Sequence, residues 1–524
     1  MVSGRKPHHH IRFITAAALF DGHDASINII RRLLQASGVE VIHLGHNRSV
    51  EEIVNAAIQE HVQGIAISTY QGGHVEFLKY MYDLLQRKHA SHIQIFAGGG
   101  GVITSREREE LMGYGINQVF SPEDGRQLGL QGMIDYMIQE TDFPAPTTVS
   151  VKGKRLEDQW GAVAASITKA EEMQEKSPVH ALPLTAQEAP VLGITGTGGA
   201  GKSSLTDELV RRYLHQFRDR SIAILSIDPS KKKTGGALLG DRIRMNAVNS
   251  TRVYMRSLAT RHSKTELSVA VKEAIQIVKK AGYDFVIVET SGIGQGDTEI
   301  TDVSDLSMYV MTSEFGTPMQ LEKIEMIDVA DFIVINKFER RGSEDALRDV
   351  RKQVQRARQL FDVSVETLPV FGTIASQFND EGTNRLFAAL MKRVEEKMGG
   401  NWPADTDFVS SPTERHVILP PDRTAYLGEI VHTVREYHHL IEEQVERMRI
   451  RHALECTKDM MQTDSKGETF VPYLDEKIAE VSQDIDPIAN KLVEEWQELR
   501  QSYQEKTLAV HVRDKEKEME LYTE

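Results

Sequence analysis

Residues Gly196–Ser203 have the composition and the spacing of a loop that binds phosphate. They match the pattern G-x-x-x-x-G-K-[ST] at every fixed position. In such a loop, consecutive backbone N–H groups face a triphosphate, Lys202 neutralises the β and γ oxygens, and Ser203 offers its hydroxyl to Mg²⁺. A short apolar run precedes the loop and a helical pattern follows it, which is the order of elements that this chemistry requires. The predicted phosphate contacts are Gly198, Gly199, Ala200, Gly201, Lys202, Ser203 and Ser204.

Three carboxylates follow this loop at places where they can reach the phosphates. Asp228 and Glu289 come directly after predicted strands, and Asp241 lies in a glycine-rich segment between them. Mg²⁺ is a hard ion that is held by one or two carboxylates together with phosphate oxygens and water. These three residues and Ser203 are therefore the candidate metal ligands.

Hydrolysis of a nucleoside triphosphate needs a stabilised γ-phosphate and an oriented water molecule. Lys202 is the predicted catalytic cation. Gly292 is expected to donate its N–H to the γ-phosphate, and Gln295 is the candidate residue for positioning water.

The segment Asn336-Lys337-Phe338-Glu339 follows another predicted strand and resembles the guanine-reading motif N-K-x-D. Glu339 has the charge of the usual aspartate with one extra methylene, so guanine is favoured over adenine. Thr373 and Ile374 are expected to close over the base. A P-loop kinase that uses ATP is the alternative.

Loops near the N-terminus carry a second set of reactive residues. Asp21 can accept the N–H of His23, which leaves the other imidazole nitrogen to bind a metal. The run Gly98–Gly101 has no side chains, so a large flat or extended ligand can lie close to the backbone.

These loops resemble the cobalamin-binding domain of the base-off, His-on mutases, whose pattern is D-x-H-x-x-G, then S-x-L, then G-G. Asp21, His23 and Ser68 match the pattern, as does the glycine run, whereas Ser26 replaces a glycine and Tyr70 replaces the leucine. The resemblance implies that His23 binds cobalt, that Asp21 tunes it, and that Ser68 contacts the displaced dimethylbenzimidazole. A flavodoxin-like domain without a cofactor is the alternative. The implied cobalamin-binding residues are Asp21, Gly22, His23, Asp24, Ser68, Tyr70, Gly98, Gly99, Gly100 and Gly101.

Alternating apolar runs and helical patterns must position these residues. A chain of 524 residues is too long for one core, and the alternation is typical of parallel α/β sheets. We predict two doubly wound α/β domains, a flavodoxin-like cobalamin-binding domain and a P-loop GTPase domain, followed by a helical C-terminal segment. The predicted divisions are a first domain at 1–140, a linker at 141–189, the P-loop domain at 190–400 and a helical region at 401–524.

The linker and the C-terminal region have the least informative sequences. We expect one amphipathic helix within Gly153–Lys176 that takes no part in a core. Long helices are predicted at Tyr426–Glu455, Tyr473–Gln483 and Asp486–Thr507, with no compact element at the C-terminus. The 124 residues from 401 are too few for a (β/α)₈ barrel of about 250 residues.

Composition restricts the functional class. A net charge of −15 argues against a general nucleic-acid surface, and one cysteine, Cys456, fits a reducing compartment. No run of eighteen apolar residues occurs, so we expect neither a membrane span nor a membrane partner, and a cytoplasmic location.

The order of motifs resembles the GTPase chaperones of methylmalonyl-CoA mutase and, with the cobalamin loops in front, the first half of the fused isobutyryl-CoA mutases. The segment Thr312–Lys323 would be an additional switch loop of that family. The resemblance implies adenosylcobalamin, Mg²⁺ and GTP or GDP as ligands. It implies an acyl-CoA-binding mutase barrel as partner, an adenosyltransferase as a further candidate, and a homo-oligomer such as a homodimer.

By this resemblance the chain is a fragment that ends in a linker toward a missing barrel. It would be a GTPase that controls cofactor loading and protects the mutase, without mutase activity of its own. Two alternatives stay open. One is a cobalamin carrier or sensor gated by GTP, and the other is an independent chaperone with a helical dimerisation arm.

Overall fold

The protein is described by a computed structural model that falls into two compact units, Met1–Thr413 and Glu414–Glu524. The first unit holds two parallel-sheet α/β domains, and the second is mainly helical, as predicted. The described residues are 6–19, 21–146, 155–176, 189–231, 234–261, 270–292, 298–315, 321–403, 426–463, 467–505, 507–512 and 515–520.

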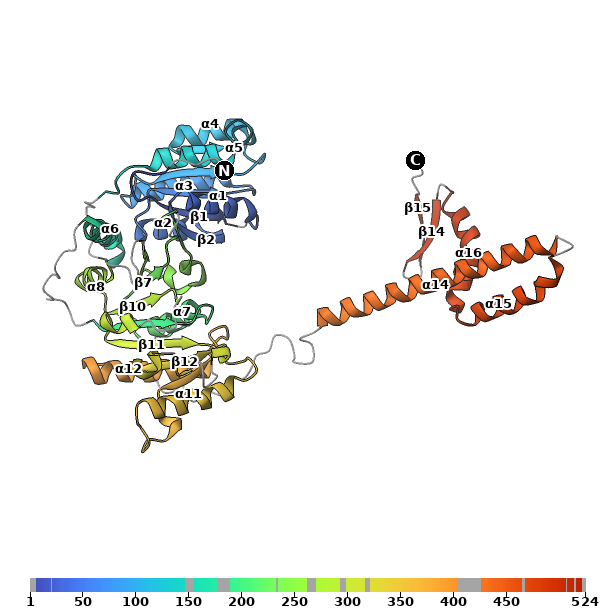
Figure 1. The fold of residues 1–524 in the computed structure, drawn as a ribbon. Helices are drawn as coiled ribbons and strands as arrows, with labels where there is room; N and C mark the ends of the chain where they lie inside the picture. The colour runs from blue at the N-terminus through green and yellow to red at the C-terminus, as the bar shows by residue number, and fades with distance from the viewer. Residues whose placement is uncertain are drawn as a thin grey trace. The chain divides into compact units, whose positions relative to one another are not determined.

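The first α/β domain is built on a parallel sheet with strand order β5-β4-β3-β1-β2-β8, in which β8 is Ala237–Leu239 (Figure 1). Its own strands are β1 (Arg12–Ala18), β2 (Glu40–Arg48), β3 (Gly64–Ser68), β4 (Gln94–Gly98) and β5 (Gln118–Phe120). The connecting helices are α1 (Ala25–Ala36), α2 (Val50–Gln59), α3 (His74–Arg87), α4 (Ser105–Tyr114) and α5 (Pro122–Thr141). Every residue of β1 is buried, as the apolar run predicts for a central strand covered on both faces.

Helix α6 (Trp160–Lys176) belongs to the core, which corrects the prediction of a linker helix outside it. Trp160 and Ile167 are buried in the same apolar cluster as the strands of both domains. The helix packs between α2 and α8 (Val271–Lys280). The charged residues on either side of Trp160–Ile167 hide this apolar stretch in the sequence.

The second α/β domain has a seven-stranded parallel sheet of order β13-β12-β11-β6-β10-β7-β9. Its strands are β6 (Val191–Gly196), β7 (Ile222–Asp228), β9 (Val253–Ala259), β10 (Phe285–Thr290), β11 (Leu306–Met311), β12 (Phe332–Asn336) and β13 (Val370–Thr373). The main helices are α7 (Lys202–Gln216), α8, α11 (Ser343–Ala357) and α12 (Glu381–Met398). Strands β9 and β11 are absent from the sequence prediction, and in β9 the reason is a buried arginine, Arg256, at the centre of the strand.

Strand β8 (Ala237–Leu239) links the two sheets. It follows β7 in the chain, yet it pairs in parallel with β2, with Glu40 opposite Ala237 and Ile42 opposite Leu239. An antiparallel bridge between Ser230 and Ala237 ties the same strand back to the end of β7. A segment of the second domain therefore completes the sheet of the first.

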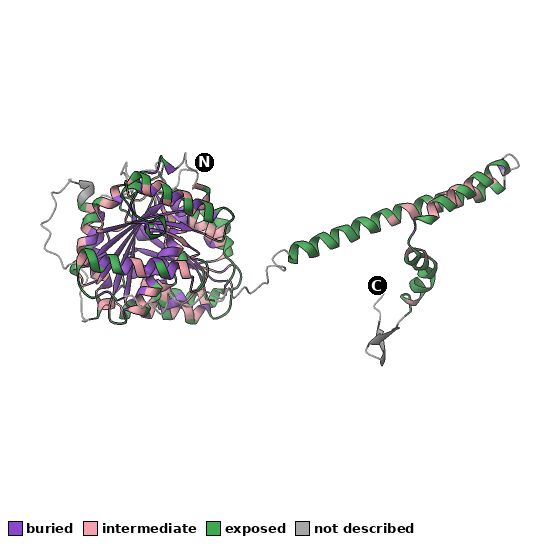
Figure 2. Ribbon diagram, turned by 90° about the horizontal axis from the view of Figure 1, so that it is seen from below, coloured by how far each residue is buried: buried purple, intermediate pink, exposed green. Residues whose placement is uncertain are grey.

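The second unit contains α14 (Tyr426–Gln462), α15 (Val471–Gln483) and α16 (Pro487–Ser502), with α15 packed along α14. A hairpin of β14 (Thr507–Val512) and β15 (Lys515–Glu520) follows, which corrects the expectation that no compact element ends the chain. Much of α14 is exposed (Figure 2). Within the described ranges, no helix combines the length and the apolar character needed to cross a membrane.

Candidate nucleotide and cofactor sites

The phosphate loop has the strand, loop and helix geometry that its sequence predicts. It runs from β6 into the N-terminus of α7, and Gly199 and Gly201 have positive φ angles of 76° and 89°. Lys202 Nζ donates to the carbonyls of Gly196 at 3.0 Å and Ser291 at 3.3 Å. The buried ammonium group therefore lies at the centre of the loop, where phosphate oxygens would replace carbonyl oxygens.

Gly292 packs directly on this loop. A Cβ atom built at Gly292 would lie 2.1 Å from Lys202 Nζ and 1.9 Å from the Gly196 carbonyl oxygen, so only glycine fits here. The close approach is what a γ-phosphate-sensing backbone requires. Gln295, the candidate for positioning water, lies outside the described residues, as does part of the proposed switch segment Thr312–Lys323.

The segment Asn336–Glu339, predicted to read guanine, contacts the phosphate loop. Asn336 Nδ2 donates to the Ala200 carbonyl at 2.8 Å, and Lys337 Nζ donates to the Gly199 carbonyl at 2.8 Å. Thr373 Oγ1 donates to Asn336 Oδ1 at 3.1 Å, which joins the two predicted base-binding segments. The residues Ile374 and Glu339 flank this cluster, and Glu339 is exposed.

The predicted metal ligands converge beside Ser203. Its Oγ lies 2.7 Å from Glu289 Oε1 and 3.1 Å from Asp241 Oδ1. Asp228 Oδ2 accepts the N–H of Gly240 at 3.2 Å. Among the residues that the structure describes, no three carboxylate, histidine or cysteine groups form a site complete enough for a metal on their own. The arrangement fits Mg²⁺ that also needs phosphate oxygens and water.

The crowding of these carboxylates changes their protonation. Burial, followed by the negative charge of Asp241, raises the pKa of Glu289 to about 7. Burial and the charges of Asp241 and Glu289 raise the pKa of Asp228 well above its usual value. The site therefore favours a proton or a cation between its carboxylates.

Asp21 and His23 form the hydrogen bond that their spacing predicts. Asp21 Oδ1 lies 2.8 Å from His23 Nδ1, and Asp21 Oδ2 accepts the backbone N–H of Tyr70 at 2.6 Å. Burial alone would raise the pKa of Asp21, but the hydrogen bonds from His23 and Tyr70 outweigh it and hold the pKa below the usual range. The His23 side chain is 63% exposed, so its Nε2 edge is open to a ligand.

The neighbouring loops also fit a large cofactor. Ser68 Oγ is buried, and no partner for it occurs in the described part of the chain, as expected for a group that awaits a ligand. A Cβ atom at Gly99 would lie 1.9 Å from the Thr69 carbonyl oxygen, so the glycine run packs closely on the loop after β3. Of the other implied residues, Gly22 precedes His23 and Asp24 is the N-cap of α1. Two cavities, of about 430 and 290 Å³, lie elsewhere, beside Trp402 and Phe378.

Comparison with known families agrees with this geometry. Residues 11–120 match the B12 binding domain, and residues 163–401 match the methylmalonyl-CoA mutase-associated GTPase MeaB. The chain thus joins a B12-binding domain to a MeaB-family GTPase domain. Fused isobutyryl-CoA mutase from Geobacillus kaustophilus is 58% identical over 99% of this chain and 49% of the relative. The protein of the same name from Cupriavidus metallidurans is 51% identical over 98% of this chain and 48% of the relative. The chain therefore spans about half the length of these relatives.

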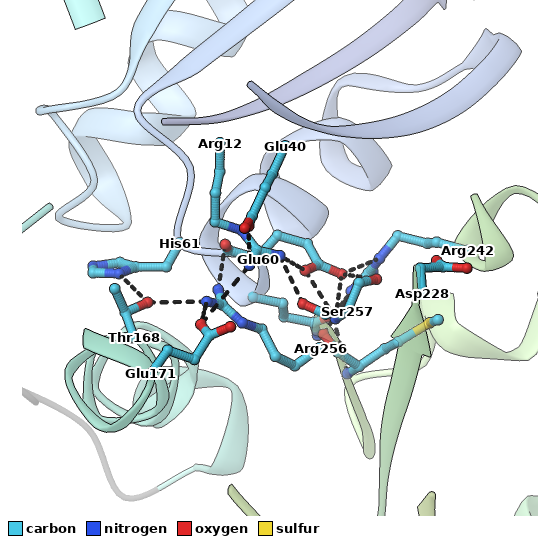
Figure 3. Close-up of polar contacts among 12 residues, drawn as sticks. Arg12, Glu40, Glu60, His61, Thr168, Glu171, Asp228, Arg242, Arg256 and Ser257 are labelled. Carbon is cyan, nitrogen blue, oxygen red and sulfur yellow. Dashed lines mark hydrogen bonds and ion pairs between the residues drawn. The ribbon is translucent and has the colours of Figure 1, made fainter. Parts of the chain in front are cut away.

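A buried cluster of charges joins the B12-binding domain, α6 and the GTPase domain (Figure 3). Glu60, at the end of α2, is fully buried and accepts from Arg12 at 2.9 Å and Arg242 at 3.3 Å. It also accepts the backbone N–H of Ser257. The other ion pairs of the cluster join Glu40 to Arg12 and Arg261, and Glu171 to Arg12, Arg256 and Arg261.

Sequence reasoning missed this cluster, because each member looks like an ordinary surface charge when it is taken alone. The available signals are Arg12, which begins the buried strand β1, and Arg256, which lies at the centre of the mainly apolar strand β9. Burial alone would raise the pKa of Glu40, but Arg261 and Arg12 outweigh it and lower the pKa to about 2. The cluster is therefore charged at neutral pH.

Replacement of Glu60 by glutamine should strongly destabilise the first unit. The change leaves two buried guanidinium groups without their shared carboxylate, at a cost of about 3–5 kcal/mol. Thermal unfolding followed by circular dichroism should show a lower midpoint for Glu60→Gln than for Glu51→Gln, which removes an exposed carboxylate from the same helix. Equal midpoints for the two variants would show that the cluster is not important for stability.

Without nucleotide and divalent cation, stability should fall as the pH rises from 6 to 8. The folded pKa of Glu289, about 7, exceeds its ordinary value of 4.5. The stabilisation of the folded state by protonated Glu289 is therefore fully present below pH 4.5 and is lost as the pH rises through 7. Melting temperatures across this range should decrease less in Glu289→Gln than in the original chain, and Glu344→Gln is the exposed control. A Glu289→Gln chain with an undiminished pH dependence would contradict the assignment.

Proposed function

We propose that the chain is the GTP-hydrolysing chaperone portion of an adenosylcobalamin-dependent isobutyryl-CoA mutase. It binds cobalamin base-off and His-on, and GTP binding and hydrolysis control cofactor loading and protect the mutase. The names of the relatives and the two domain families support this proposal. The intact family interconverts isobutyryl-CoA and n-butyryl-CoA, a reaction that we do not expect from this chain alone.

The observation that carries the proposal is the path of the segment between β7 and β9. Its strand β8 is the edge strand of the B12-binding sheet. Two residues after that strand, Asp241 lies 3.1 Å from the phosphate-loop hydroxyl of Ser203. The next residue, Arg242, pairs with Glu60 of the B12-binding domain. Binding or hydrolysis of the nucleotide therefore acts on the segment between β7 and β9, whose strand β8 is also part of the B12-binding sheet.

The roles of the nucleotide-site residues follow from their positions. Lys202 neutralises charge on the γ-phosphate, the backbone N–H of Gly292 binds the same group, and Ser203 with the carboxylates holds Mg²⁺. Asn336 and Glu339 select guanine. Gln295 orients water for hydrolysis.

On the cofactor side, His23 holds cobalt and Asp21 fixes the orientation and basicity of the imidazole. Ser68 and the glycine run receive the nucleotide tail. When bound, adenosylcobalamin supplies a cobalt–carbon bond whose homolysis provides radicals. The contribution of this chain is to bind, orient and retain that group.

The partner is an acyl-CoA-binding mutase barrel, in the same longer chain or in another subunit. The exposed apolar side chains of α14, spaced by three and four residues, support a docking role for the second unit. They are Leu427, Ile430, Val434, Tyr437 and Ile441. A homodimer and an adenosyltransferase that delivers the cofactor complete the proposal.

The alternative is a cobalamin carrier or sensor in which GTP only gates affinity. Phosphate release with and without a barrel-bearing partner separates the two. A chaperone hydrolyses GTP, whereas a carrier binds the nucleotide tightly and shows negligible turnover in both cases.

Coupling should depend on the contact between Ile243 and β2. Ile243 Cδ1 would lie 2.8 Å from a Cβ atom built on Gly45, so its side chain packs directly on the B12-binding sheet. We expect the rate of cobalamin dissociation from the original chain to differ between GTP and GDP by roughly fivefold or more, the lower end of typical coupling.

The variant Ile243→Ala should reduce this difference toward onefold while GTP turnover is retained, because the residue touches neither ligand site. Val329→Ala, which truncates an exposed aliphatic side chain of the same domain, is the control. Equal dissociation rates with GTP and GDP in the original chain would contradict the proposed function.

A further inference from the structure

The two positions that depart from the cobalamin-binding pattern contact each other. Ser26 stands where the pattern has glycine, and Tyr70 stands where it has leucine. Ser26 Oγ lies 2.7 Å from Tyr70 Oη. Neither glycine nor leucine has a hydroxyl group, so this hydrogen bond exists only because both positions differ.

The ring of Tyr70 lies between the other parts of the cofactor site. Its centroid is 5.3 Å from that of His23, with the two planes tilted by 43°. A Cβ atom built on Gly100 would lie 2.9 Å from Tyr70 Cε1, so the ring rests against the backbone of the glycine run. The ring thus occupies space between the imidazole and the run that is expected to receive the nucleotide tail.

The backbone of Tyr70 is anchored separately from its partly exposed side chain, whose hydroxyl contacts Ser26. The Tyr70 N–H donates to Asp21 Oδ2 at 2.6 Å, which anchors the residue to the carboxylate that also orients His23. Two residues earlier, Ser68 Oγ is buried without a partner in the described chain. The Tyr70 ring therefore lies against Gly100 and near His23, on the loop that also carries Ser68.

We propose that Tyr70 is a gate for cobalamin, closed by its hydrogen bond to Ser26 and opened by rotation of the side chain. The inference rests on the proposed function, because it assumes that this cradle binds cobalamin. Rotation of an aromatic side chain is much faster than association at micromolar concentrations. The closed population therefore lowers the apparent association rate by the fraction of molecules that are open.

The test measures association of adenosylcobalamin with the full chain by stopped-flow absorbance. Ser26→Ala and Tyr70→Phe each remove the same hydrogen bond and leave the ring in place. Each should raise the association rate by roughly two- to tenfold, as expected for loss of one hydrogen bond. Since both variants remove one interaction, the double variant should be no faster than either single variant. The control is Tyr80→Phe, which removes a hydroxyl from an exposed tyrosine of α3.

The rate of cobalamin dissociation distinguishes a gate from a general loosening of the cofactor site. In Ser26→Ala, which leaves every predicted cobalamin-binding residue in place, a gate that acts before binding leaves the dissociation rate unchanged, whereas a loosened site releases cobalamin faster. Association rates equal to that of the original chain, or additive effects in the double variant, would overturn the gate while cobalamin binding remains. If the original chain and His23→Ala both show no base-off, His-on spectrum, the proposed function fails and the gate fails with it.

Discussion

The carboxylate of Glu60 is the group on which the junction of the two α/β domains depends. It is completely buried, and its charge is balanced by Arg12 from the B12-binding domain and Arg242 from the GTPase domain. A buried ion without partners costs several kcal/mol, so Glu60 is satisfied only while both domains supply their arginines. The same constraint applies to Arg256, which reaches from β9 to Glu171 on α6. The buried ion pairs thus hold the two α/β domains together, although each domain has its own sheet.

This junction lies next to the nucleotide site. Arg242 directly follows Asp241, and Asp241 contacts the phosphate-loop serine. On the other side, the sheet that receives β8 ends in the loop that carries Asp21 and His23. Densely packed side chains do not deform continuously, so a local displacement shifts them from one packing arrangement to another. A cation or γ-phosphate that moves Asp241 therefore has a short mechanical route to the cofactor domain.

The sequence predicts most of what depends on local pattern. The phosphate loop, the Asp21–His23 pair and the strands after which they lie all occur in the structure where spacing and periodicity suggest. What it does not predict depends on contacts between distant segments. Strand β8 has only three residues, and it is a strand because it pairs with β2 of the other domain. The apolar first half of α6 is hidden by the charged residues that flank it, and the charge cluster arises only when both domains are folded together.

We propose that nucleotide state acts on the B12-binding sheet through β8. Hydrogen–deuterium exchange of the full chain, with Mg²⁺ and either a non-hydrolysable GTP analogue or GDP, tests it directly. We expect a nucleotide-dependent change in exchange at the backbone amides of β2 and of residues 21–26, as well as at the phosphate loop. Changes confined to the nucleotide-binding segments, with β2 and residues 21–26 identical in the two states, would contradict it.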